Sequence, residues 1–143
     1  MTGNLDESRR KAREAYDRGS YDMAQKLYHP LAESGDADSQ YYLGETLLLR
    51  AYDHVNAVGW WRKAAEQGFV MSQLSLSYMY QDGRGVKKNT FEAYKWFSLA
   101  HARHEKGEEA LFSDADSVYR SLKLTAAQKK KADEWVKNWK PKT

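Results

Sequence analysis

The chain of 143 residues is long enough for one domain with a single core, and its 41% hydrophobic, 13% aromatic and 30% charged residues are typical of a globular protein. It contains no cysteine, which excludes disulfides, thiol nucleophiles and zinc–thiolate sites. The net charge of +3 is too small to indicate nucleic acid as a partner.

Helices are predicted along the whole chain, from apolar residues with helical spacing and from residues that favour helix starts. Three residues suited to the N-cap position precede such stretches, namely Ser20, Asp53 and Asn89. Asn89 with Glu92, and Thr125 with Gln128, have the spacing of a capping box. The expected helices cover residues 5–18, 21–34, 37–50, 54–67, 70–81, 90–103, 107–121 and 126–139.

A pattern of small and large residues around the segment WWRKAAEQG at 60–68 recurs on both sides of it. The earlier copy comprises Ala24, Leu27, Tyr28, Leu31, Ala32 and Gly35, and the later copy comprises Ala93, Trp96, Phe97 and Ala100. This spacing between copies belongs to helical hairpins, which bury their apolar faces only by stacking. We therefore predict an all-α solenoid of about three antiparallel helical hairpins in a single domain over 1–143, with repeats near 5–35, 36–68 and 69–104 and a C-terminal cap at 105–143.

The last predicted helix carries the positive charge of the chain. From Leu122 onward seven lysines stand against Asp133 and Glu134, which leaves about −2 on residues 1–121. This helix can cap the open end of the solenoid, lie on an anionic membrane or contact nucleic acid. We favour the cap, because a stacked array ends in an apolar face that needs a cover. Stable membrane insertion and nucleic-acid binding are not expected.

Four segments together resemble the Sel1-like repeat family, a branch of the tetratricopeptide-type helical repeats. They are PLAESGDADSQYYLG at 30–44, WWRKAAEQG at 60–68, LSYMYQDGRGVKKN at 76–89 and AYKWFSLA at 93–100. The segment 124–139 also resembles the C-terminal helix of many bacterial members. Departures from the family pattern are Ser77 for the usual glycine, His104 for the glycine that closes a repeat, and residues 51–53 in place of the first glycine turn.

The resemblance implies a right-handed superhelix whose concave face binds another protein, without catalysis or a cofactor. Relatives act as adaptors or scaffolds, and some resemble immunity proteins that neutralise a secreted bacterial toxin. The sequence predicts an adaptor or scaffold and leaves the immunity protein as an alternative. The identity of the partner and the oligomeric state are not predicted.

Carried over to this chain, the repeat geometry places the first helix of each hairpin on the concave face. Tyrosine, methionine and arginine are enriched at the cores of interfaces. The residues expected to contact the partner are Arg9, Arg13, Tyr16, Asp38, Tyr41, Glu45, Leu48, Met71, Tyr78 and Gln81. An aromatic stripe with helical spacing is also typical of a core, and Leu74 on the same face is the residue most expected to be buried.

No motif predicts catalysis, because the chain lacks a nucleophile elbow, a phosphate-binding loop and a zinc-binding helix. His101 and His104 lie on one face of a predicted helix, so both imidazoles could reach one metal ion, with Glu105 or Glu109 as a third ligand. The decayed third repeat explains these histidines more simply, so a small metal-dependent enzyme is only an alternative and no metal site is assigned.

The sequence bears on localisation through two negative features. No apolar run approaches the roughly 18 residues of a membrane span, and the first residues lack the apolar middle of a signal peptide. The chain as it stands is therefore expected to be soluble and cytoplasmic, or periplasmic if a signal peptide has been removed.

Overall fold

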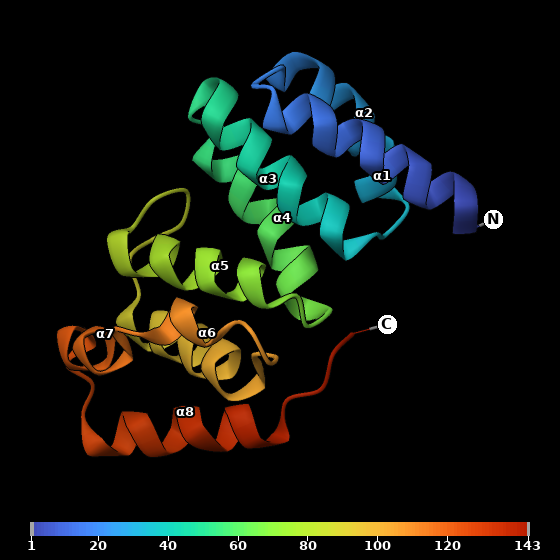
Figure 1. Ribbon diagram of the computed structural model, residues 1–143. Helices are drawn as coiled ribbons and strands as arrows, with labels where there is room; N and C mark the ends of the chain where they lie inside the picture. Colours follow the sequence, from blue (N-terminus) through green and yellow to red (C-terminus); the bar gives the residue numbers. More distant parts are fainter. Residues whose placement is uncertain (1, 143) are drawn as a thin grey trace.

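A computed structural model describes residues 2–142, and Figure 1 shows helices stacked in successive pairs from the N-terminal end. They are α1 (Thr2–Asp17), α2 (Tyr21–Glu33), α3 (Ala37–Ala51), α4 (His54–Glu66), α5 (Val70–Asp82), α6 (Thr90–Arg103), the 3₁₀ turn η1 (Glu109–Phe112), α7 (Ala115–Leu122) and α8 (Ala126–Asn138). Within residues 2–142 there is no strand. None of these helices has both the length and the apolarity needed to cross a membrane.

Seven of the eight predicted helices match α1 to α6 and α8, but the helix predicted over 107–121 is wrong. The chain instead forms η1, breaks, and begins α7 after Asp114. Gly107 has a φ of 100°, and its backbone N–H donates a hydrogen bond to the Glu109 carboxylate at 2.8 Å. Ser113 and Asp114 then separate η1 from α7, and both residue types compete with helical hydrogen bonding through their own side chains.

The predicted N-caps are only partly confirmed. The side chain of Asp53 accepts a hydrogen bond from the Asn56 N–H at 3.1 Å, but Ser20 makes no such bond. Asn89 accepts from the Glu92 N–H at 3.0 Å. The Glu92 carboxylate pairs with Lys95 Nζ at 3.0 Å instead of returning to Asn89, so this capping box is open.

Helices α1 and α2, α3 and α4, and α5 and α6 form three hairpins that pack on each other in chain order. The small residue that opens the repeat pattern in each second helix is buried, with exposed fractions of 0% for Ala24, 0% for Ala57 and 1% for Ala93. Large rings follow one turn later, and Tyr28, Trp61 and Phe97 are at most 1% exposed. The repeat pattern in the sequence is therefore the buried face of each second helix. The all-α solenoid is confirmed.

The C-terminal helix α8 packs on α6 along the lower edge of Figure 1, as predicted for a cap. Thr125 and Gln128 form the predicted capping box at its start. The ring centroids of Trp135 and Trp96 are 5.3 Å apart in an edge-to-face arrangement. Beyond the helix, Lys142 Nζ pairs with the Glu66 carboxylate at 2.8 Å.

Helix α8 also repeats the pattern of the earlier second helices, which was not predicted. Ala132, Trp135 and Val136 have the same relative spacing as Ala93, Trp96 and Phe97. Ala132 is fully buried, as its counterparts are. The C-terminal segment is thus a fourth, irregular copy in which a short first helix, α7, and a second helix, α8, both pack on α6.

Candidate protein-binding surface

The ten residues predicted to bind a partner lie on α1, α3 and α5, the first helices of the three hairpins. We call the surface they form the A-helix face. Positions of α3 and α5 correspond through the repeat, so Asp38, Tyr41, Glu45 and Leu48 match Met71, Leu74, Tyr78 and Gln81. The structure gives these positions very different degrees of exposure.

Two arginines of α1 are held by acidic residues of the chain itself. Arg9 donates hydrogen bonds to both carboxylate oxygens of Asp36, one of them at 3.0 Å from Nε. Arg13 donates to Asp17 at 3.0 Å, and its guanidinium lies 4.5 Å from the ring centroid of Tyr42. These contacts fix the guanidinium groups at the N-terminal end of the A-helix face.

Tyr42, which was not predicted, is the centre of the aromatic contacts on this part of the molecule. Its ring centroid lies 5.2 Å from that of Tyr16, 5.6 Å from that of Tyr28 and 5.0 Å from that of Tyr41. The repeat gives no hint of this role, because the corresponding position of the next hairpin is Ser75. Burial raises the pKa of Tyr16 to about 12.

Tyr41 belongs to the core, with an exposed fraction of 8%. Its ring packs on Phe69 at a centroid distance of 5.3 Å, and burial raises the pKa of its hydroxyl. The corresponding Leu74 is 5% exposed, as expected for this residue. This position of the repeat faces the neighbouring hairpin, so Tyr41 supports the A-helix face from beneath.

Asp38 and Glu45 are half-buried carboxylates on α3. Burial raises the pKa of both groups. The Tyr41 hydroxyl opposes the shift of Glu45, and the charges of Arg9 and Arg13 oppose that of Asp38. Neither forms an ion pair within residues 2–142. Asp36, two residues before Asp38, forms an ion pair with Arg9, whereas Asp38 and Glu45 form none within residues 2–142.

The C-terminal part of the A-helix face is less charged. Tyr78 is 36% exposed, while Leu48 and Met71 are partly buried against the central core. Gln81 Nε2 donates to Ser121 Oγ of α7 at 3.3 Å, which joins α5 to the irregular fourth copy. The predicted residues therefore fall into a polar part on α1 and α3 and a more apolar part on α5.

Two segments of the chain match a known family of repeats. Residues 37–69 and 70–100 match the model of the Sel1 repeat. These two matches cover the second and third hairpins, whose buried faces carry the repeat pattern. This chain is a Sel1-like repeat protein.

Two proteins similar to this Sel1-like repeat protein are longer than it. It is 31% identical over 84 residues to the chitin synthase regulator SKT5 of Saccharomyces cerevisiae, a match of 55% of this chain and 12% of the relative. The crystal structure of c5321, a protective antigen of uropathogenic Escherichia coli with an SLR fold, superposes with a TM-score of 0.70 at 30% identity. That match covers 81% of this chain and 25% of c5321, so the chain spans a quarter or less of either relative.

Sel1-like repeat proteins are generally protein-interaction modules and typically lack catalytic activity. The two histidines considered as metal ligands have other contacts here. His101 Nδ1 lies 3.1 Å from the Tyr119 hydroxyl, and His104 Nδ1 donates to the His101 carbonyl oxygen at 2.6 Å. In the part of the chain that the structure describes, no three histidine or acidic side chains are grouped to hold a metal ion.

Proposed function

We propose that this Sel1-like repeat protein is a non-catalytic adaptor that binds a segment of another protein on its A-helix face. The observation that carries the proposal is the pair of half-buried carboxylates, Asp38 and Glu45, which lack an ion pair within residues 2–142. A half-buried charge without an ion pair destabilises the free protein. A lysine or arginine of a bound segment would compensate it.

The apolar part of the face complements this charge. Tyr78 offers a large rigid surface with a hydroxyl, and such residues dominate the binding energy of many interfaces. Met71 adds a flexible side chain that adapts to different shapes. The expected partner segment therefore has a basic residue opposite α3 and an apolar residue opposite α5.

Residues that hold the face in place differ from those that contact the partner. Arg9 is occupied by Asp36, and Tyr41 is in the core. We assign partner contacts mainly to four residues, Asp38, Glu45, Met71 and Tyr78. Arg13, Tyr16, Leu48 and Gln81 lie at the margin.

The test is affinity capture from an extract of the source organism, followed by calorimetry with the purified partner. The test variant is Glu45→Gln with Tyr78→Ala. The control is Glu134→Gln with Tyr52→Ala, which makes the same changes at exposed sites on α8 and the α3–α4 turn. The proposal expects the test variant to lose the partner and the control to keep it.

A partner that binds both variants equally would place the binding surface elsewhere. A single stoichiometric partner would indicate a dedicated complex, whereas several weaker partners would indicate an adaptor. Circular dichroism melts of both variants ensure that lost binding does not reflect unfolding.

A further inference from the structure

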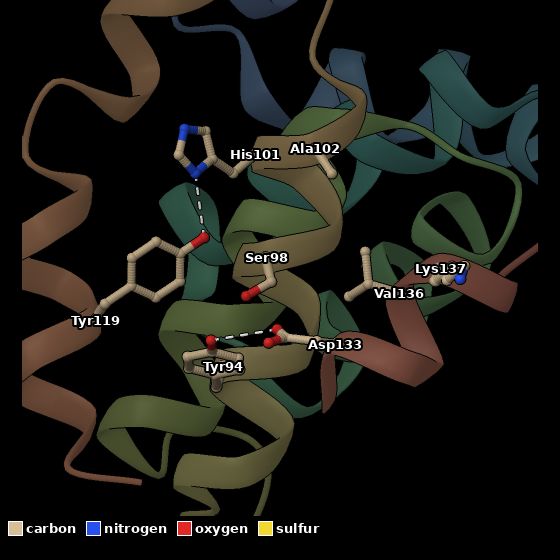
Figure 2. A pocket seen from close by; sticks show the side chains of 8 residues that line it. All are labelled: Tyr94, Ser98, His101, Ala102, Tyr119, Asp133, Val136 and Lys137. Carbon is tan, nitrogen blue, oxygen red and sulfur yellow. Dashed lines mark hydrogen bonds between the residues drawn. The ribbon is translucent and has the colours of Figure 1, made fainter. Parts of the chain in front are cut away.

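A pocket of about 540 Å³ opens where the fourth copy departs from the regular repeat. Figure 2 shows α6 as its floor, α7 on one side and α8 on the other. The polar side chains around it come from all three helices. They are Tyr94, Ser98 and His101 of α6, Tyr119 of α7, and Asp133 and Lys137 of α8.

The hydroxyl groups of Tyr94 and Tyr119 form the side-chain hydrogen bonds of the pocket. Tyr94 donates to Asp133 Oδ1 at 3.3 Å, and the Tyr119 hydroxyl bonds His101 Nδ1 at 3.1 Å (Figure 2). With His101 in the tautomer protonated at Nε2, Nδ1 accepts the Tyr119 proton. The oxygen lone pairs of both tyrosines and the second oxygen of Asp133 then remain as acceptors. With His101 in this tautomer, the pocket suits a ligand that donates hydrogen bonds.

The acidic side chain that lines the pocket is that of Asp133, which lies at its exposed edge on α8. Asp133 forms no ion pair within residues 2–142, although Lys137 follows it by one helical turn. In Figure 2 the Lys137 ammonium lies beyond Val136, away from Asp133. Besides the main effect of burial, Asp133 also raises the pKa of the Tyr119 hydroxyl, as does Asp116. Asp133 is therefore the group of the pocket that would attract a cation, with Lys129, Lys130 and Lys137 of the same helix opposing it.

The Tyr119 ring adds a second means of recognising a cation. It lies 5.2 Å from the Tyr94 ring with a tilt of 53°, and it is the more accessible of the two because Tyr94 is only 8% exposed. Aromatic faces attract ammonium groups within about 6 Å of the ring centroid. Ser98 Oγ is buried at the floor of the same pocket, and its hydroxyl opposes the rise that burial causes in the pKa of Tyr94 and of Tyr119.

These side chains do not form a catalytic triad, although serine, histidine and aspartate are all present. His101 bonds Tyr119, Asp133 bonds Tyr94, and neither bonds Ser98. A nucleophilic serine requires its base within hydrogen-bond reach. We therefore consider these side chains as a binding site and not as a catalytic site.

We propose that the pocket between α6, α7 and α8 binds a primary ammonium group, as carried by a lysine side chain or a small alkylamine. The carboxylate of Asp133 and the hydroxyl oxygens of Tyr94 and Tyr119 accept its three N–H bonds, and the Tyr119 ring contacts the adjoining methylenes. The site lies between the third hairpin and the fourth copy, apart from the A-helix face, so it stands independently of the function proposed above.

The test is titration of the isotopically labelled full chain, followed by amide chemical shifts. The probes are butylammonium chloride, Nα-acetyl-lysine N-methylamide and the uncharged Nα-acetyl-norleucine N-methylamide. Small ligands of this kind bind in roughly the millimolar range. We expect saturable shifts around Ser98, Tyr119 and Asp133 with both amines and none with the norleucine compound.

Variants show whether the named groups bind the ammonium. Asp133→Asn is expected to weaken binding about tenfold or more, because it removes the charged acceptor. Glu134→Gln makes the same charge change at the next residue and should leave binding unchanged. Tyr119→Phe keeps the ring and removes one acceptor, so it should weaken binding less than Asp133→Asn.

Three results would overturn the proposal. They are equal shifts with the norleucine compound, equal losses in the Asp133→Asn and Glu134→Gln variants, or no local shifts at tens of millimolar amine. Tighter binding of the lysine derivative than of butylammonium would identify a protein side chain as the source, and the reverse would identify a free amine. Far-ultraviolet circular dichroism of each variant establishes that it is folded.

Discussion

Gly44 of α3 lies against the indole of Trp61 of α4, so that a Cβ atom at Gly44 would come within 2.4 Å of Trp61 Nε1. The same Nε1 donates a hydrogen bond to the Tyr41 carbonyl oxygen at 3.2 Å. The absence of a side chain at Gly44 thus sets how closely the two helices approach. In the next hairpin the equivalent residues are Ser77 and Phe97, so a slightly larger residue stands where the ring is smaller.

Gly44→Ala is therefore expected to destabilise the protein by about 1 to 3 kcal/mol, because the added methyl must displace a buried indole. The matched control is Gly59→Ala in α4, where nothing lies within 4 Å of the added carbon. That change should be neutral or stabilise by up to about 1 kcal/mol, since alanine favours the helix. Urea unfolding followed by circular dichroism measures both, and equal stabilities would contradict the packing described.

Tyr41 and Tyr78 are expected to respond differently to truncation. Tyr41→Ala removes a core ring and should cost about 3 to 5 kcal/mol. Tyr78→Ala, at the exposed end of the same face, should cost about 1 kcal/mol or less. Thermal melts of the two single variants check this, and a larger loss from Tyr78→Ala would reverse the assignment of core and surface.

Glu45→Gln should stabilise the free protein at neutral pH. The pKa of Glu45 is raised by burial in the folded state, so the folded chain binds its proton more tightly than the unfolded chain. The carboxylate therefore lowers stability as pH rises above its ordinary pKa of 4.5, and this loss persists at pH 7. Melting temperatures of the variant and the parent should converge near pH 4 and separate at pH 7. A constant difference would argue against this origin.

Asp36→Asn is expected to show the opposite dependence. Burial would raise the pKa of Asp36, but hydrogen bonds from Arg9 and Ser39 lower it overall. Its ion pair with Arg9 thus stabilises the protein above the ordinary pKa of 3.8 and is lost as pH falls through the folded-state value. The variant should lose about 1 to 2 kcal/mol at pH 7, because a charged hydrogen-bonded pair is broken, and little at pH 3. Chemical denaturation at both pH values provides the measurement.

Removing residues 124–143 should cause aggregation or a large fall in melting temperature. The deletion takes away Ala132 and Trp135 and exposes Trp96, which is 4% exposed in the intact chain. Removing only residues 140–143 loses the Lys142 to Glu66 pair, an exposed contact worth roughly 1 kcal/mol or less. A longer deletion with unchanged melting would show that α8 does not act as a cap.

The sequence by itself determined the repeat, and with it the fold. The small and large residues at Ala57, Trp61 and their counterparts recur because each second helix buries the same face against its neighbours. Such a pattern depends on neighbouring residues of one helix, so it can be read without knowing how distant segments meet. The sequence did not predict the breaks at Gly107 and Ser113. The apolar residues of 107–121 have a spacing that suits one continuous helix, but local hydrogen bonds such as that from the Gly107 N–H to Glu109 outweigh it.

Only the tertiary structure decided which members of the A-helix face are exposed and where the pocket lies. Tyr41 and Tyr78 belong to the same face. Tyr41 is buried against Phe69, whereas Tyr78 is 36% exposed. The pocket joins Tyr94, Tyr119 and Asp133, which come from three different helices. Its existence depends on how α7 and α8 pack on α6. Contacts between distant segments depend on helix packing, which no local pattern of residues specifies.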